Sequence, residues 1–221
     1  DDTEVAYQSI QITKGQRGDL STGRTQRSWS AAEREKGFVA KVNARYLDND
    51  QTIDIVSAFF LAEDGASETW SVRMRIRDQF DTLNWTETGV RDDNELRVTI
   101  AQPDGQVVEK AWPVPPSGYI SHVEALLLPR ILADRGVEGE FAYYRYNTQL
   151  TELTLRRDVF EATKDGWRLT TRVHEDAPEE TLELDTNGAV IAQRVSDDIR
   201  GKPLGRKEIA AIWRHKGLPL D

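Results

Sequence analysis

Three arginines at alternate positions are the first residues whose spacing suggests chemistry. Arg73, Arg75 and Arg77 lie two residues apart, so on a β-strand their side chains would share one face. Such a row of cations would suit an anionic group, or it could be the solvated face of a half-buried strand, paired with acidic neighbours. Trp70 and Met74 alternate with the arginines, so the opposite face of this strand is predicted to be apolar.

Tryptophans are the second group of residues that could bind a ligand. Five of the six occur in or beside predicted strands: Trp29, Trp70, Trp85, Trp112 and Trp167. On a concave sheet they could line a pocket for an acyl chain or stack against sugar rings. The alternative is that they fill the core beneath a helix.

The histidines give no catalytic motif. His122, His174 and His215 are far apart in the sequence, and no serine lies in the G-x-S-x-G turn of a nucleophile. His122 is expected in the first turn of a helix, where the helix dipole disfavours a charged imidazolium. We therefore interpret the three histidines as ordinary core or surface residues and predict no catalytic residue.

Metal and cofactor motifs are also missing from the sequence. His174, Glu175 and Asp176 are consecutive, and consecutive strand residues point to opposite faces. The run 48–50 resembles part of a calcium loop but lacks the glycine and the distal glutamate of an EF-hand. No glycine-rich phosphate loop is present. We predict no metal site and no cofactor, while the 38 acidic residues leave a carboxylate-based hydrolase as an alternative.

Charge and cysteine content limit the partners and the compartment. The 221-residue chain has a net charge of −9, which disfavours nucleic acid as a partner. It has no cysteine, which rules out disulfides and thiol chemistry but fits both the cytosol and cysteine-poor bacterial export. Met74 is the only methionine and residue 1 is Asp1, so we expect an upstream signal segment to have been removed. The predicted location is periplasmic or secreted, with the cytosol as the alternative.

Most of the chain alternates between apolar and polar residues, as half-buried strands do. Strands are predicted over 5–13, 24–30, 38–46, 53–61, 70–77, 82–88, 96–100, 107–112, 141–146, 150–160, 167–173, 182–184 and 189–195. Pro103-Asp104-Gly105 and the run 185–188 are predicted tight turns that join strand pairs. No stretch reaches the roughly 18 apolar residues that a membrane span requires.

Two helices are predicted. Ser121 and Glu124 form a capping box, so a helix should begin at about His122. Pro129 lies inside this helix and should kink or divide it, and Gly136 is a plausible terminator. A short C-terminal helix is predicted over 206–216.

The predicted fold class is mainly β (α+β): a curved antiparallel sheet or half-barrel wrapped around one central helix, with a short C-terminal helix. Residues 1–221 are predicted to form one β-rich domain, with a possible two-part organisation of strands over 1–118 and helix plus strands over 119–221. Whether one sheet or two covers the helix is left open.

A long antiparallel meander, a helix interrupted by Pro129, further strands and a short terminal helix resemble the LolA/LolB-type lipoprotein carriers and related uncharacterised exported bacterial half-barrels. The resemblance covers about 5–195 and is one of organisation, so it assigns no functional residue. Carriers usually have one sheet and several lid helices, whereas this chain has more strands and fewer helices.

We therefore expect a non-enzymatic exported β protein that binds an apolar or lipid-like small molecule, or a partner protein, in the concavity of its sheet. The expected ligand-binding residues are Trp70, Met74, Trp85, Trp167 and Arg75, with the arginine placed near an anionic head group. A carbohydrate-binding β module and a carboxylate-based hydrolase are the alternatives.

Overall fold

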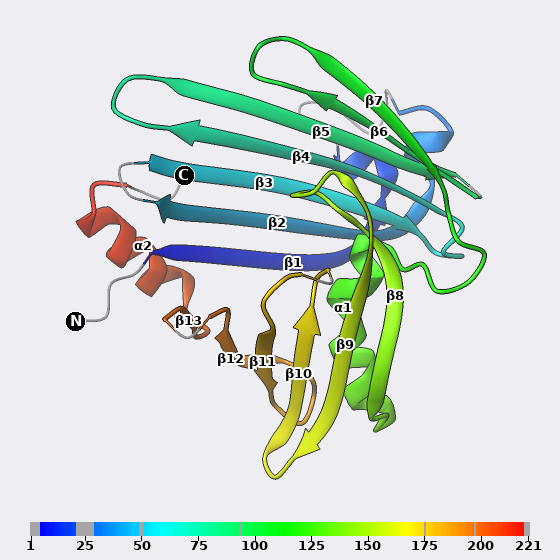
Figure 1. The fold of residues 1–221 in the computed structure, drawn as a ribbon, viewed down its shortest axis with the longest axis vertical. Helices are drawn as coiled ribbons and strands as arrows, with labels where there is room; N and C mark the ends of the chain where they lie inside the picture. Colours follow the sequence, from blue (N-terminus) through cyan, green and yellow to red (C-terminus); the bar gives the residue numbers. More distant parts are fainter. Residues whose placement is uncertain are drawn as a thin grey trace. The chain divides into compact units, whose positions relative to one another are not determined.

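Two antiparallel sheets make up most of this protein (Figure 1). The computed structural model describes residues 5–20, 29–48, 51–92, 94–174, 176–196 and 198–218. The first sheet contains β1 (Ala6–Gln16), β2 (Lys36–Asp48), β3 (Gln51–Ala62), β4 (Ser67–Arg77), β5 (Thr82–Asp92), β6 (Glu95–Ala101) and β7 (Val107–Pro113), in that order.

The second sheet runs in the order β13-β12-β11-β10-β9-β8. Its strands are β8 (Gly139–Asn147), β9 (Glu152–Thr163), β10 (Gly166–Arg172), β11 (Glu180–Leu184), β12 (Val190–Arg194) and β13 (Arg200–Gly201). The helices are α1 (His122–Arg135) and α2 (Arg206–His215), with short 3-10 turns η1 (Arg17–Leu20) and η3 (Ala32–Arg34). Among the described residues, β1 does not pair with β7 and β8 does not pair with β13, so each sheet is open.

The chain divides into two compact units. The first contains residues 1–117 and 121–123, and the second contains residues 118–120 and 124–221. The prediction of a single domain over 1–221 stays a prediction.

In the first unit, both faces of the sheet bury side chains. On one face, Val39, Phe60 and Ala62 pack together with Leu20 of η1. Arg17 lies over the ring of Phe60, 5.3 Å from its centroid, and its guanidinium pairs with the carboxylate of Glu35. The opposite face carries Trp70 and the candidate site.

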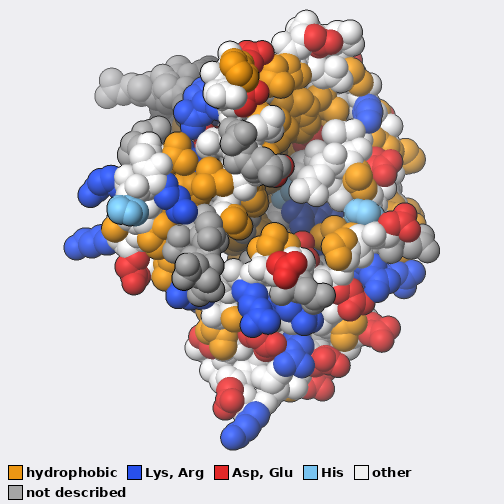
Figure 2. Space-filling model, turned by 60° about the vertical axis from the view of Figure 1, so that its left-hand side comes forward, with side chains coloured by type: hydrophobic (Ala, Val, Ile, Leu, Met, Phe, Trp, Pro, Cys, Tyr) orange, Lys and Arg blue, Asp and Glu red, His pale blue; other side chains and the backbone are white. Residues whose placement is uncertain are grey.

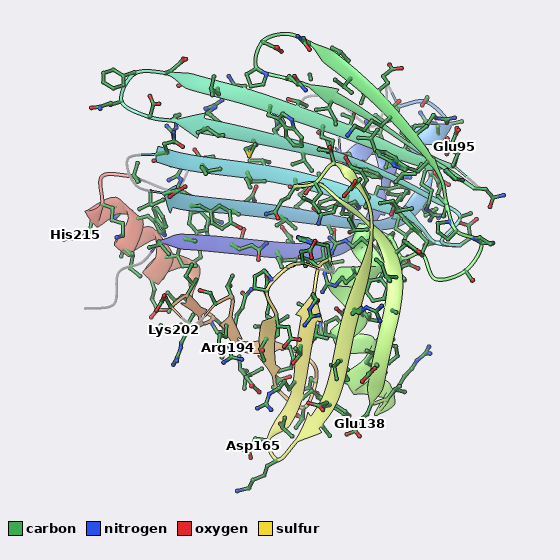
Figure 3. The ribbon with its side chains drawn as sticks, viewed as in Figure 1. Glu95, Glu138, Asp165, Arg194, Lys202 and His215 are labelled. Carbon is green, nitrogen blue, oxygen red and sulfur yellow. The ribbon has the colours of Figure 1, made fainter. Side chains whose placement is uncertain are left out.

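In the second unit, α1 packs on the sheet through a cluster formed by Leu132, Ala133, Phe160, Leu169 and Leu184. The β11–β12 turn passes close to the helix at Gly188, which has φ +74°. A Cβ at Gly188 would lie 2.7 Å from the Cα of Arg130, so glycine is required there for both conformation and space. Glu138, just before β8, accepts a hydrogen bond from the N–H of Ala162 at 2.8 Å and so ties the start of β8 to the end of β9 (Figure 3).

The predicted fold class is confirmed: the protein is mainly β, with one internal and one C-terminal helix. The internal helix begins at His122, and Gly136 follows its end with φ +60°, as predicted. The tight turns at Gly105 and Gly188 also lie where they were predicted, each with positive φ. Of the strand predicted over 24–30, residues 24–28 lie outside the described residues. The same holds for residues 49–50 of the calcium-loop-like run 48–50, and for Glu175 of the run 174–176.

One alternative of a local prediction is wrong. Pro129 lies inside α1 but does not divide it, and the predicted kink stays a prediction. Leu128 before the proline and Leu132 after it both pack against the second sheet, so tertiary packing holds the helix together across the lost hydrogen bond.

Candidate functional site

The candidate site lies on one face of the first sheet, which we call the Trp70 face. Antiparallel register places Phe59 of β3, Trp70 of β4 and Gly89 of β5 next to one another. Because side chains alternate between faces, every second residue along each strand shares this face. Its members from β1 to β6 include Ile10, Ile12, Ala40, Val42, Ala44, Tyr46, Ile53, Ile55, Ser57, Phe59, Leu61, Glu68, Trp70, Val72, Met74, Ile76, Leu83, Trp85, Glu87, Gly89, Arg91, Leu96, Val98 and Ile100.

Trp70 is fixed at the buried part of this face. Its side chain is 1% exposed, and its Nε1–H donates to Oε1 of Glu87 at 2.9 Å. The indole ring occupies the space beside Gly89, where a Cβ would lie 2.0 Å from the Cζ2 of Trp70. Glycine at this position therefore allows the tryptophan to lie flat against β5.

His122 completes the buried part. Its ring stacks on Phe59 with centroids 4.5 Å apart and lies 4.8 Å from the Trp70 ring. Its Nδ1 is 4.0 Å from Oε1 of Glu68, and both side chains are almost fully buried. The prediction that His122 is an ordinary core or surface residue therefore becomes more specific: it is a core residue packed against two aromatic rings.

Arg91 is the cation on this part of the face. It lies opposite Glu68 in the register of β4 and β5 and is 8% exposed. Its guanidinium donates to the carbonyl oxygens of Gly65 and Ala66, at 2.6 and 3.1 Å. The arginine thereby holds the β3–β4 turn against β5.

The other part of the Trp70 face is apolar and only partly covered. Met74 lies opposite Ile55 on one side and Trp85 on the other, and all three side chains are half-buried. Beyond them, Tyr46 is 40% exposed and Leu83 is 44% exposed. The face thus changes from a closed polar and aromatic cluster to an accessible apolar surface.

The structure brings together three of the five predicted ligand-binding residues. Trp70, Met74 and Trp85 share the Trp70 face. Arg75 lies on the opposite face of the same sheet, where its Nε donates to Oδ1 of Asn84 at 3.3 Å. Strand parity therefore separates this arginine from an apolar ligand bound beside Trp70.

Trp167, the fifth predicted residue, belongs to the second unit. It stacks on Phe160 with ring centroids 5.0 Å apart and packs on the cluster that contains Leu132. This tryptophan fills the core beneath α1, which was the alternative that the sequence left open.

A second buried polar cluster centres on Asp158 of β9, which is 1% exposed. Its carboxylate accepts hydrogen bonds from the hydroxyls of Tyr143, at 2.5 Å, and Thr171, and from Nε of Arg156 at 2.9 Å. Burial raises the pKa of Tyr143. These contacts satisfy the buried carboxylate, as a structural network requires.

The described residues offer little else for chemistry. They contain no group of three or more acidic, histidine or cysteine side chains able to hold a metal ion. In the same described ranges, neither helix is long and apolar enough to cross a membrane. All six tryptophans are described, and each side chain is buried or half-buried.

Comparison with known proteins gives a fold and no activity. No family model matches this chain, and no curated protein matches it. A crystal structure titled "Beta-barrel-like Protein of Domain of Unknown Function DUF1849", from Brucella abortus, is similar, with a TM-score of 0.52 at 12% sequence identity over 90% of this chain and 95% of that chain. The likeness supports a mainly β fold and shows no link to the LolA/LolB carriers.

The sequence interpretation missed Glu68, Glu87 and His122 as members of one cluster. The signal for the two glutamates was present, because both occur at positions where the alternation of β4 and β5 predicts apolar residues. A glutamate on an apolar face indicates a buried carboxylate that needs a partner. Nothing in the sequence pairs the first turn of α1 with these strands.

Proposed function

We propose that this protein is a non-enzymatic exported β protein that binds an apolar, acyl-chain-like ligand on the Trp70 face. The supporting observation is the partly covered row formed by Ile55, Met74 and Trp85, which continues the buried cluster around Trp70. Binding sites for small apolar molecules are usually lined by such side chains with a few polar groups at one end.

Hydrophobic burial supplies the driving force in this proposal. Each methylene of a ligand that leaves water contributes about 0.8 kcal/mol. Eight methylenes covered by the partly exposed row would contribute roughly 6 kcal/mol before the cost of ordering the chain is subtracted. Hydrophobic side chains are also exposed among interspersed acidic and basic ones on the side of the molecule shown in Figure 2.

The buried carboxylates favour binding over hydrolysis. Glu68 and Glu87 are 2% and 0% exposed, and Glu87 accepts the indole N–H of Trp70. A general acid or base must be within hydrogen-bond reach of its substrate. The burial of these two side chains therefore supports a structural role.

Sugar binding has less support. Stacking platforms need tryptophan rings that present a flat face to solvent, whereas all six tryptophans are buried or half-buried.

Ligand capture tests the proposal directly. Native mass spectrometry of the purified protein, followed by lipid extraction, should find an acyl-chain species at near-stoichiometric amount. Dansyl-undecanoic acid then serves as a defined fluorescent probe for binding to delipidated protein.

Two adjacent residues of β3 provide a matched pair of variants. Ile55→Asn places an amide on the Trp70 face and should weaken probe binding by about 10-fold, because it removes roughly half of a buried aliphatic side chain's contribution. Val56→Asn makes the same kind of change on the opposite face, where Val56 is 44% exposed, and should leave the affinity unchanged. Equal affinities of both variants would contradict binding on the Trp70 face.

Export is part of this proposal, and the cytosol is the alternative. A reporter enzyme that is active only outside the cytosol, fused to the full gene product, distinguishes the two locations.

A further inference from the structure

The face of the first sheet opposite Trp70 carries an excess of positive charge, although the whole protein is acidic. We call it the Arg75 face. Over residues 7–11, 41–47, 52–58, 71–77 and 82–88, the alternate positions on this face hold five basic side chains and one acidic side chain: Lys41, Arg45, Arg73, Arg75, Arg77 and Asp54. The local net charge is therefore positive, whereas that of the whole chain is −9.

Asp54 does not neutralise the whole set. Its carboxylate pairs with Nε of Arg45 at 2.5 Å and with an Nη of Arg77 at 2.6 Å. Lys41, Arg73 and Arg75 are exposed. Among the residues that the structure describes, no acidic side chain forms an ion pair with these three.

The three exposed cations are spread in two dimensions around an apolar centre. Lys41 is on β2 and lies about 10 Å across the strands from Arg73 and Arg75 on β4. Along the strands, Lys41 is offset by about 7 Å from Arg73 and by about 14 Å from Arg75. Val56, which lies opposite Arg73 on the intervening strand, is 44% exposed. Amide and hydroxyl side chains occupy neighbouring positions: Asn43, Asn84 and Thr86.

We propose that the Arg75 face docks on the surface of an anionic phospholipid bilayer. Arginine guanidinium groups bind phosphate through paired hydrogen bonds, and a bilayer presents many phosphates in one plane. An acidic peptide would instead follow a single line and use a groove or a sheet edge. The net charge of the protein repels such a bilayer, but this repulsion is screened beyond about 8 Å at physiological salt, so the local patch decides binding at contact.

Vesicle flotation tests the docking. The native chain should bind vesicles made of equal parts phosphatidylglycerol and phosphatidylcholine, and should bind pure phosphatidylcholine vesicles far less. Arg73→Gln with Arg75→Gln should lower the vesicle affinity by roughly 25-fold, since one basic residue near an anionic surface contributes about 5-fold. Raising the salt concentration should weaken the binding of the native chain and narrow this difference.

A double variant with the same change in net charge is the control. Arg194 on β12 and Lys202 after β13 are both exposed (Figure 3), and Arg194→Gln with Lys202→Gln should retain most of the vesicle binding. Thermal unfolding of both double variants should match that of the native protein, because all four side chains lie at the surface.

Any of these vesicle results would overturn the proposal: equal losses in the two double variants, equal binding to neutral and anionic vesicles, or no vesicle binding by the native chain. Tight binding of soluble poly-glutamate that displaces the vesicles would also overturn it, in favour of an acidic protein partner. The docking is independent of the apolar ligand, since probe binding to the Trp70 face is measured without vesicles.

Discussion

Replacing Gly89 by alanine is expected to destabilise the first unit by about 3 kcal/mol or more. The added Cβ would lie 2.0, 2.1 and 2.3 Å from three atoms of the Trp70 ring. These distances are far below van der Waals contact, so the ring has to move. Overpacking of a well-packed core costs about 1–3 kcal/mol.

Movement of Trp70 has a second cost. The Nε1–H of Trp70 donates to Glu87, which is 0% exposed, and a buried carboxylate that loses a donor costs about 1–3 kcal/mol more. Urea denaturation followed by circular dichroism measures the sum. Gly201→Ala is the matched control, because its Cβ would lie at least 3.4 Å from the Gln193 side chain, and it should change stability by less than about 1 kcal/mol.

A double-mutant cycle separates the clash from other effects of alanine. In a Trp70→Leu background the ring is absent, so Gly89→Ala should cost less than about 1 kcal/mol. If Gly89→Ala costs as much in that background as in the native protein, or costs nothing in the native protein, then the close approach of Trp70 to β5 is wrong.

Three further changes test the packing and the buried charges of the second unit by urea denaturation. Leu132→Ala should cost about 2–4 kcal/mol because Leu132 is buried in the cluster beneath α1, whereas Ile131→Ala, at a side chain 40% exposed, should cost less than half as much. Asp158→Asn should cost about 3 kcal/mol of unfolding free energy, because it breaks the buried pair with Arg156. Arg168→Gln is the control, since it breaks an exposed pair worth about 0–1 kcal/mol. An equal or smaller loss for Asp158→Asn than for this control would contradict a structural role of Asp158. Burial raises the pKa of Glu180, against the lowering effect of Arg156. The contribution of the Glu180 side chain to stability is therefore present at low pH and is lost as the pH rises through the folded-state pKa. Glu180→Gln should therefore gain stability relative to the native protein between about pH 4 and about pH 7, and a constant difference across this range would contradict the raised pKa.

The comparison of Leu132 with Ile131 shows how α1 is covered. Both are apolar neighbours on the helix, but Ile131 is 40% exposed and Leu132 is 7% exposed. Helical periodicity identifies an apolar side of the helix, but only the position of the second sheet decides which residues of that side are covered.

Local patterns in the sequence determined the elements of this protein. Alternation predicted most of the strands, the glycines at 105 and 188 predicted tight turns, and Ser121 with Glu124 predicted the start of α1 at His122. The same alternation placed Trp70 and Met74 on the face opposite to that of Arg73, Arg75 and Arg77. These features depend on neighbours within a few residues, which the sequence displays directly.

Only the tertiary structure decided how distant segments combine. It gave two open sheets where the sequence left one or two, placed Trp167 in a different core from Trp70, and stacked His122 on Phe59 beside the buried Glu68. Each of these contacts joins residues that are far apart along the chain. Alternation fixes the face on which a side chain lies but not the element that covers that face, because pairing and packing depend on the free energy of the whole assembled core.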